Sequence, residues 1–217
     1  ALIWNTTGNN NVAVGYMAAW SNSLASGTVA IGVNAAAGIG SGYSNKGGAY
    51  LGYNSGYSAS SSSDYNTLLG YQSGYLVSSG ANNIIIGAAT TTTGGITTGK
   101  NNILLGLGVR YGLSQTGSNQ LNIGNLIFGT SVAGGNNFSS GKVGIGTTTP
   151  NQTLSVVGSI NSYGNSAGYY IQGNKILYAS STNGSTLVGD GAGSALKGST
   201  FDNVAVGYQS LHLATSS

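Results

Sequence analysis

A short pattern of hydrophobic positions recurs along the chain: an apolar residue, a variable residue, a second apolar residue and then glycine. It appears as NVAVG ending at Gly15, NIIIG ending at Gly87 and NILLG ending at Gly106. Alternation with a period of two is typical of a short β-strand, and the glycine indicates a turn directly after it. The glycines that close the pattern are Gly15, Gly32, Gly52, Gly70, Gly87, Gly106, Gly124, Gly146 and Gly207.

The spacing of this pattern predicts the fold. Successive glycines from Gly15 to Gly146 are 17, 20, 18, 17, 19, 18 and 22 residues apart. A single strand cannot bury one of its faces, whereas strands stacked at about 4.8 Å form a continuous core. Frequent glycine and β-branched residues exclude helix over most of the chain. The sequence therefore predicts an all-β fold, a repetitive parallel β-solenoid.

Asparagine often stands four residues before the closing glycine. Asparagine tolerates left-handed turns and hydrogen-bonds its own backbone, and stacked asparagines also form amide ladders between coils. Both interpretations are structural. The asparagines at this position are Asn11, Asn66, Asn83, Asn102 and Asn203.

The middle residue of each strand points to the opposite face from its two apolar neighbours. It is Ala13 in the first repeat and Leu68, Ile85 and Leu104 in central repeats. We expect these middle residues to form a second face, which a solitary solenoid would expose to water. Another strand of the same coil or another subunit would cover that face, and we favour another subunit.

The composition supports a fold of short strands and argues against nucleic-acid binding and membrane-spanning functions. The chain has 39 glycines, no cysteine, 4% charged residues and 40% hydrophobic residues, too many for a disordered polar tract. Its net charge of +3 comes from basic residues that never cluster, so nucleic-acid binding is not expected. No apolar run approaches the roughly 18 residues of a membrane span.

Candidate catalytic and metal-binding residues are sparse. The segment Gly94–Lys100 (GGITTGK) fits part of a phosphate-binding loop, but Asn101 replaces the required Ser or Thr and a strand follows instead of a helix. His212 is the only histidine, which makes a metal cluster or a catalytic triad unsupported. We predict no cofactor and no bound metal.

The three carboxylates are Asp64, Asp190 and Asp202. A polysaccharide depolymerase on this scaffold would need a pair of them across a groove, and turn or cap roles are commoner for Asp beside Gly. The segment GDGAG, from Gly189 to Gly193, is similar to a calcium-binding repeat but occurs once. We therefore predict that the protein is not an enzyme.

Tyrosine is unusually frequent, with 14 residues against three phenylalanines. Tyrosine packs its ring while its hydroxyl stays in water. Two interpretations remain open: a stacked aromatic ladder that supports the solenoid, or an adhesive surface for glycans or protein. The candidate residues, each of which directly follows a glycine, are Tyr16, Tyr53, Tyr57, Tyr71, Tyr75 and Tyr208.

Repeats such as NNVAVGYMAA, GTVAIGVNAAAG and DNVAVGYQSL resemble the head repeats of trimeric autotransporter adhesins, where an NSVAIG-like strand precedes G-x-x-small. The resemblance covers roughly residues 9–130 and 200–212. It implies a left-handed parallel β-roll in which three chains pack around an axis. Because the adhesin unit is shorter than the spacing here, these coils must carry longer turns.

A second stretch, KVGIGTTTPNQTLSVVGSINSYG from Lys142 to Gly164, resembles a segment of bacteriophage tail fibres and bacterial surface fibres. In those proteins it precedes a self-cleaving intramolecular chaperone. Leu154, Val156 and Ile160 would supply its strand, after a turn at Pro150. Both resemblances imply homotrimeric fibres outside a cell or on a virion.

We predict three regions: a β-roll repeat array over residues 1–133, a connector with short strands over 134–186, and resumed β-roll repeats over 187–217. Strands in the connector are expected around Leu154–Ile160 and Tyr169–Tyr178. The chain is expected to be a fragment of a longer fibre, since both its ends lie inside repeat-like sequence.

These observations favour a structural and adhesive fibre protein, extracellular or at a cell surface, that mediates attachment without catalysis. A bacteriophage tail-fibre segment for host recognition is the alternative, and a self-stacking extracellular filament subunit is a minor one. The expected partners are further copies of this chain and a host-surface glycan or protein.

Overall fold

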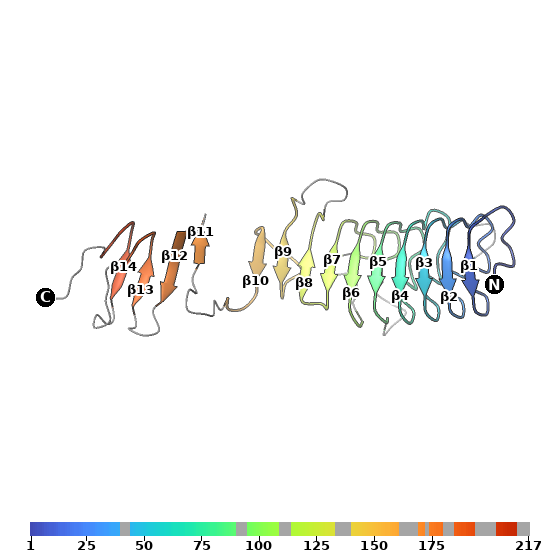
Figure 1. The fold of residues 1–217 in the computed structure, drawn as a ribbon, viewed down its shortest axis with the longest axis horizontal. Helices are drawn as coiled ribbons and strands as arrows, with labels where there is room; N and C mark the ends of the chain where they lie inside the picture. Colours follow the sequence, from blue (N-terminus) through green and yellow to red (C-terminus); the bar gives the residue numbers. More distant parts are fainter. Residues whose placement is uncertain are drawn as a thin grey trace. The chain divides into compact units, whose positions relative to one another are not determined.

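Short strands and tight turns make up the chain, as Figure 1 shows. The computed structural model describes residues 1–39, 44–89, 95–108, 114–132, 140–160, 169–171, 174–179, 185–193 and 203–211. Across these ranges the fold is all-β, without helix. The chain divides into two compact units, Ala1–Gly158 and Ser159–Ser217.

The first unit begins as a parallel β-solenoid, which confirms the predicted fold class. Each coil contributes one three-residue strand, and each strand pairs in parallel with the next. Equivalent residues of the repeat pair directly, so that Val29 lies opposite Ala49 and Ala49 opposite Thr67. These strands are β1 (Val12–Val14), β2 (Val29–Ile31), β3 (Ala49–Leu51), β4 (Thr67–Leu69), β5 (Ile84–Ile86), β6 (Ile103–Leu105) and β7 (Leu121–Ile123).

The middle residue of each strand points into the coil, so the expected facing of the strands was wrong. Leu68 is 0% exposed, Ile85 9% and Leu104 1%, whereas Val12 is 49% and Val14 57% exposed. Each coil turns back on itself within about 20 residues, and its narrow interior has room for one strand side chain. The two flanking apolar residues are therefore left on the outside.

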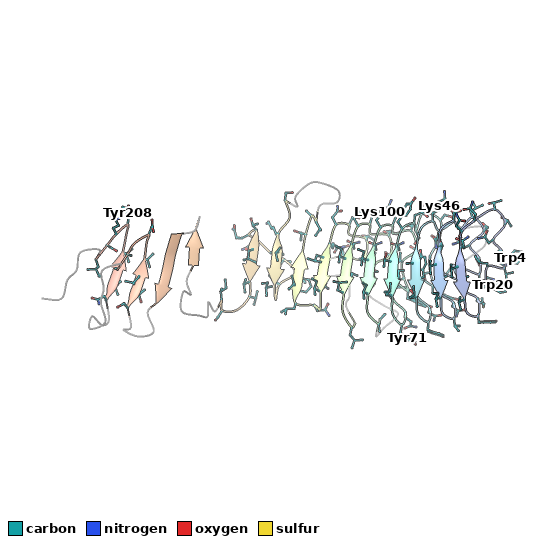
Figure 2. The ribbon with its side chains drawn as sticks, in the orientation of Figure 1. Trp4, Trp20, Lys46, Tyr71, Lys100 and Tyr208 are labelled. Atoms are coloured by element: carbon teal, nitrogen blue, oxygen red, sulfur yellow. The ribbon has the colours of Figure 1, made fainter. Side chains whose placement is uncertain are left out.

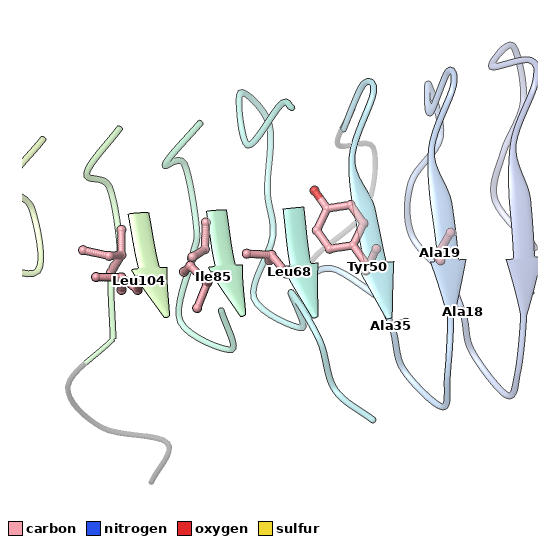
Figure 3. Packing of buried hydrophobic residues seen from close by; sticks show 11 residues of the cluster. Ala18, Ala19, Ala35, Tyr50, Leu68, Ile85 and Leu104 are labelled. Atoms are coloured by element: carbon pink, nitrogen blue, oxygen red, sulfur yellow. The ribbon is translucent and has the colours of Figure 1, made fainter. Parts of the chain in front are cut away.

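Interior side chains vary in size from coil to coil and are accommodated locally. Ala35, Tyr50, Leu68, Ile85 and Leu104 belong to one buried cluster (Figure 3). The Tyr50 ring fills space that side chains at two glycines of its own coil would need, because a Cβ at Gly48 or at Gly56 would collide with it. A large interior residue is thus matched by glycine beside it.

Hydrogen bonds join the coils on the turn side as well as in the sheet. The amide nitrogen of Ala19 donates to the oxygen of Ala35 at 2.8 Å, and that of Ala36 donates to the oxygen of Ser55 at 2.8 Å. The amide of Gly56 continues this series at 2.9 Å from the oxygen of Ser73. Turns without regular strand structure therefore still stack in register, which satisfies their buried backbone groups.

The regular winding ends after β7, although the sheet continues. Strand β8 (Ile127–Gly129) pairs antiparallel with β7 and with β9 (Val143–Ile145), and β10 (Leu154–Val156) pairs in parallel with β9. The hydrogen-bonded ladder thus runs from residue 12 to residue 156, across the boundary expected at residue 134. The division between the compact units falls after Gly158.

The second unit contains a four-stranded sheet in the order β11-β12-β13-β14. Strand β11 (Tyr169–Ile171) and strand β12 (Asn174–Ala179) are antiparallel, as are β12 and β13 (Thr186–Val188). Strands β13 and β14 (Val204–Val206) are parallel and in register. The solenoid pattern resumes with β13, because Leu187 and Ala205 are again buried middle residues.

Substitution of Tyr50 by phenylalanine is expected to change how stability depends on alkaline pH. The Tyr50 hydroxyl donates to the oxygen of Ser63 at 3.2 Å, and burial raises the pKa of Tyr50 well above its ordinary value. Tyr50 thus contributes stability that is complete below about pH 10 and is lost as the pH rises further, because only the unfolded chain then ionises it. The Tyr50→Phe variant should therefore lack this loss, in which the free energy of unfolding falls by about 1.4 kcal/mol for each pH unit.

Denaturant unfolding between pH 8 and pH 12 measures this slope. At neutral pH the Tyr50→Phe variant should lose about 1 kcal/mol, the value of one hydrogen bond. The exposed Tyr16 provides the control, and the Tyr16→Phe variant should follow the wild-type pH profile. An unchanged alkaline slope in Tyr50→Phe would contradict the assignment.

Candidate functional site

The outward side chains of the first sheet form an apolar surface, which we call the outer face. It consists of the first and third residues of each strand, and Ile84 and Ile86 remain 39% and 41% exposed at its centre. None of its members is charged. The outer face comprises Val12, Val14, Val29, Ile31, Ala49, Leu51, Thr67, Leu69, Ile84, Ile86, Ile103, Leu105, Leu121 and Ile123.

The same outward apolar positions recur beyond the regular coils. In β9 and β10, Val143 and Leu154 are exposed, and Leu154 lies directly opposite Val143 in the ladder. In the second unit, Val204 and Val206 flank the buried Ala205 in the same way and are 72% and 68% exposed. The repeat therefore leaves outward side chains, almost all of them apolar, exposed or half-buried on strand after strand.

The motif glycines allow neighbouring coils to approach closely. Gly15 and Gly70 both have a φ of 127°, and a Cβ on either would lie 2.5 Å from the carbonyl oxygen of the next motif glycine. Gly32, Gly52 and Gly87 have a φ of 133°, and a side chain on each would collide with the next motif glycine in the same way. Gly106 shares this backbone conformation, with a φ of 131°.

The remaining motif glycines lie in other surroundings. Gly124 has a φ of 60° and open space around its Cβ position, at the turn between β7 and β8. A Cβ on Gly146 would approach Val157 at an ordinary 3.4 Å, and one on Gly207 would have nothing within 4 Å among the described residues. Close stacking of glycines recurs in the second unit, where Gly189 has a φ of 126° and its Cβ would lie 2.4 Å from the carbonyl oxygen of Gly207.

Three of the asparagines form a buried amide ladder with one unpredicted member. The Nδ2 atom of Asn83 donates to the Oδ1 atom of Asn66 at 3.1 Å, and that of Asn102 donates to the Oδ1 atom of Asn83 at 3.0 Å. Gln120 extends the ladder, because its backbone nitrogen donates to the Oδ1 atom of Asn102 at 2.9 Å. Gln120 occupies the asparagine position of its repeat, so alignment by position would have found it.

The other two asparagines lie outside this continuous ladder. The Oδ1 atom of Asn11 accepts from the backbone nitrogen of Thr28 at 2.9 Å, but Thr28 and then Gly48 occupy the equivalent position in the next coils. Asn203 donates its backbone nitrogen to the hydroxyl of Ser185 at 3.2 Å. The Nδ2 atom of Asn203 has no hydrogen-bond partner among the described residues.

Four of the six candidate tyrosines come together in two stacked pairs on adjacent coils. The ring centroids are 5.3 Å apart in Tyr53 and Tyr71, and 5.1 Å apart in Tyr57 and Tyr75. Tyr71 lies beyond the C-terminal ends of the strands, at the opposite edge from Lys46 and Lys100 (Figure 2).

Tyr16 and Tyr208 stand apart from these pairs. Tyr16 is 70% exposed and follows β1, two coils before Tyr53, while Tyr208 is 74% exposed and belongs to the second unit. Tyr16 and Tyr208 therefore take no part in the two stacked pairs.

A hollow in the first unit lies beside one of the stacked tyrosines. Tyr75 lines it together with Ala88, Ala89 and Ile96. Tyr75 is the only ionisable residue among those that line it. The surroundings offer apolar contact and a phenol, with neither a carboxylate nor an imidazole.

The remaining candidates for chemistry do not assemble into a site within the described ranges. No group of three His, Cys, Asp or Glu side chains is placed to hold a metal ion there. The Oδ1 atom of Asp64 accepts from the backbone nitrogen of Lys46 at 2.9 Å, which is a turn-stabilising role. Gly94, Asp202 and His212 lie outside the described residues.

Comparison with family models, with curated proteins and with solved structures finds no match to this chain. Across the part that the structure describes, no helix has the length and apolar character needed to cross a bilayer.

Proposed function

We propose that this chain is a structural and adhesive segment of an extracellular fibre, and that three copies assemble through their outer faces. The observation that carries the proposal is the row of exposed and half-buried outward side chains, almost all of them apolar, on successive strands. Large, continuous apolar surfaces on proteins generally mark sites of interaction. Isolated exposed side chains would need no such explanation, but a ladder of them in register does.

The shape and chemistry of the outer face favour another copy of the same chain as its partner. Ten strands at about 4.8 Å give the sheet a length of about 43 Å. The face carries no charge to recognise a charged ligand, and its flat rows of Val, Ile and Leu match a second set of such rows. Three copies around an axis would cover every outer face, whereas one chain alone leaves it in water.

Attachment in this proposal depends on surfaces that assembly leaves free. One such surface is the edge of the first unit that carries Tyr71, beyond the C-terminal ends of the strands. Tyr71 remains 52% exposed there. Tyrosine is common at contact surfaces because a rigid ring and a hydroxyl are presented together. Host-surface glycans or proteins are the ligands that this edge would contact.

Substitution of Ile86 by lysine is expected to dissociate the assembly while each chain stays folded. Ile86 lies at the centre of the outer face, and its side chain already meets solvent in the single chain, so the lysine costs little there. Burying three ammonium groups between copies would be strongly unfavourable. Sedimentation equilibrium at micromolar concentration should change from three chain masses to one.

Thr98→Lys is the matched control, because Thr98 is exposed but lies outside the outer face. This variant should keep the mass of three chains. A wild-type protein that sediments as a stable monomer at micromolar concentration would refute the proposed assembly. Electron micrographs of the wild type should show elongated particles.

A further inference from the structure

In each of the two tyrosine pairs, the two rings lie close together and nearly parallel, which suits a reaction between them. The planes of Tyr53 and Tyr71 differ by 11°, and those of Tyr57 and Tyr75 by 9°. Their centroid separations, 5.3 and 5.1 Å, are close to the spacing of adjacent strands at about 4.8 Å. Stacking of the coils therefore sets the distance between the rings.

The backbone of these coils is held by hydrogen bonds beside each pair. The amide nitrogen of Gln72 donates to the oxygen of Tyr53 at 2.8 Å, and that of Ser58 donates to the oxygen of Tyr75 at 3.1 Å. The side chains themselves are accessible, because Tyr53 is 45% exposed and Tyr57 and Tyr75 are half-buried. Each pair thus combines a fixed backbone with rings that solvent reaches.

Stacking also limits what else these rings can do. In each pair, one face of each ring is turned toward the other ring, so that face is closed to a ligand. The hydroxyl and the carbons beside it lie at the ring edge, which stacking does not cover. Those carbons carry much of the unpaired spin when a phenol loses one electron and its proton.

We propose that Tyr53–Tyr71 and Tyr57–Tyr75 are sites of oxidative cross-linking, at which a one-electron oxidant of the haem-peroxidase class joins adjacent coils through dityrosine bonds. Each phenol gives up one electron and its hydroxyl proton. The two radicals form one bond between ring carbons next to the hydroxyls. The hydrogen on each of these carbons then moves as a proton to the ketone oxygen of its own ring, which restores both phenols. Hydrogen peroxide accepts two electrons and two protons and becomes two water molecules.

This chemistry goes beyond the proposed fibre function and does not depend on assembly. The chain contains no cysteine, so disulfides cannot join its coils. Each dityrosine would connect residues 18 positions apart in sequence. Two such bonds on the same two coils would oppose the separation of those coils, and the linked protein should unfold more slowly than the untreated one.

Peptide mapping after peroxidase treatment tests the proposal directly. The full chain, mixed with an equal amount of ¹⁵N-labelled chain at micromolar concentration, is exposed to a haem peroxidase and hydrogen peroxide. Cleavage after Lys46 and Lys100 and before Asp64 separates the members of each pair into peptides 47–63 and 64–100. We expect these peptides joined, lighter by two hydrogen atoms per bond, and without isotope mixing.

Tyr→Phe variants assign the bonds, since phenylalanine keeps the ring and removes the reactive hydroxyl. Tyr71→Phe should leave one bond, the double variant with Tyr75→Phe should leave none, and the exposed Tyr16→Phe should leave both. Three results would overturn the proposal: peptides that stay separate while dityrosine fluorescence develops, joined peptides that persist in the double variant, or peptides of mixed isotope.

Discussion

Replacement of Gly70 by alanine is expected to destabilise the protein by at least about 3 kcal/mol, a large part of the 5–15 kcal/mol that stabilises a typical domain. Gly70 has a φ of 127°, in a region where residues with a side chain are strained. The added Cβ would also lie 2.5 Å from the carbonyl oxygen of Gly87 and 2.7 Å from its carbonyl carbon. Neither coil can move away without breaking the hydrogen bonds between strands.

Gly27→Ala separates backbone strain from collision. Gly27 has a φ of 65°, but nothing lies within 4 Å of its Cβ position. Only the cost of a left-handed conformation remains, about 1–2 kcal/mol. Denaturant midpoints of the two variants give the comparison, and equal losses would show that close stacking of the motif glycines contributes nothing.

Replacement of Asn83 by alanine is expected to cost about 2–4 kcal/mol, because buried polar groups would lose their partner. The Oδ1 atom of Asn83 accepts from the backbone nitrogen of Asn102 and from its Nδ2 atom, both at 3.0 Å. Its own Nδ2 atom donates to the oxygen of Gly99 at 3.0 Å. Asn83 is 0% exposed, so water would not replace these bonds without opening the coil.

Asn101→Gly is the corresponding exposed control. The Nδ2 atom of Asn101 donates to the Oδ1 atom of Asn119 at 3.1 Å, on the surface. Its φ of 58° suits glycine, and water can take the place of the lost amide. Thermal or chemical unfolding should show a change below about 1 kcal/mol. If both variants lost the same stability, the buried ladder would have no special role.

The strands and their stacking were predictable because the strand motif recurs many times along the sequence at a nearly regular spacing. The closing glycine fixed the end of each strand, as with Val14 before Gly15, and the regular spacing fixed which strands pair. Asparagine at a constant position predicted a turn residue or an amide ladder, and three of the five asparagines form the ladder. These features depend on residue type and period, which a sequence carries without ambiguity.

The facing of the strands was not predictable by the same reasoning. In β4 and β6 the middle residue and at least one flanking residue are both large and apolar, as Leu68 and Leu69 show. The alternation of side chains along such a strand then defines two apolar faces, but it does not show which of them points into the coil. The size of the coil decides it, and the glycines beside the interior residues Tyr50 and Leu68 were the available signal.

The antiparallel hairpin of β7 and β8 was also missed. Gly124 and Asn125 stand between two short apolar runs, which is a recognised signal for a hairpin turn, and both have a φ near 60°. The solenoid period extended over this segment and concealed the signal. Because the regular repeat explained Gly124 as one more closing glycine, the sequence pattern did not predict the hairpin turn.

In-register pairing of Val29 with Ala49, and of Ala49 with Thr67, gives every coil an equivalent beginning and end. Deleting or duplicating the residues between two equivalent positions would bring matching partners together again and leave the outer face continuous. Interior volume sets the limit, because Tyr50 needs the glycines of its own coil. We therefore expect that the molecule can be lengthened or shortened by whole coils wherever the interior side chains of the new neighbours fit together.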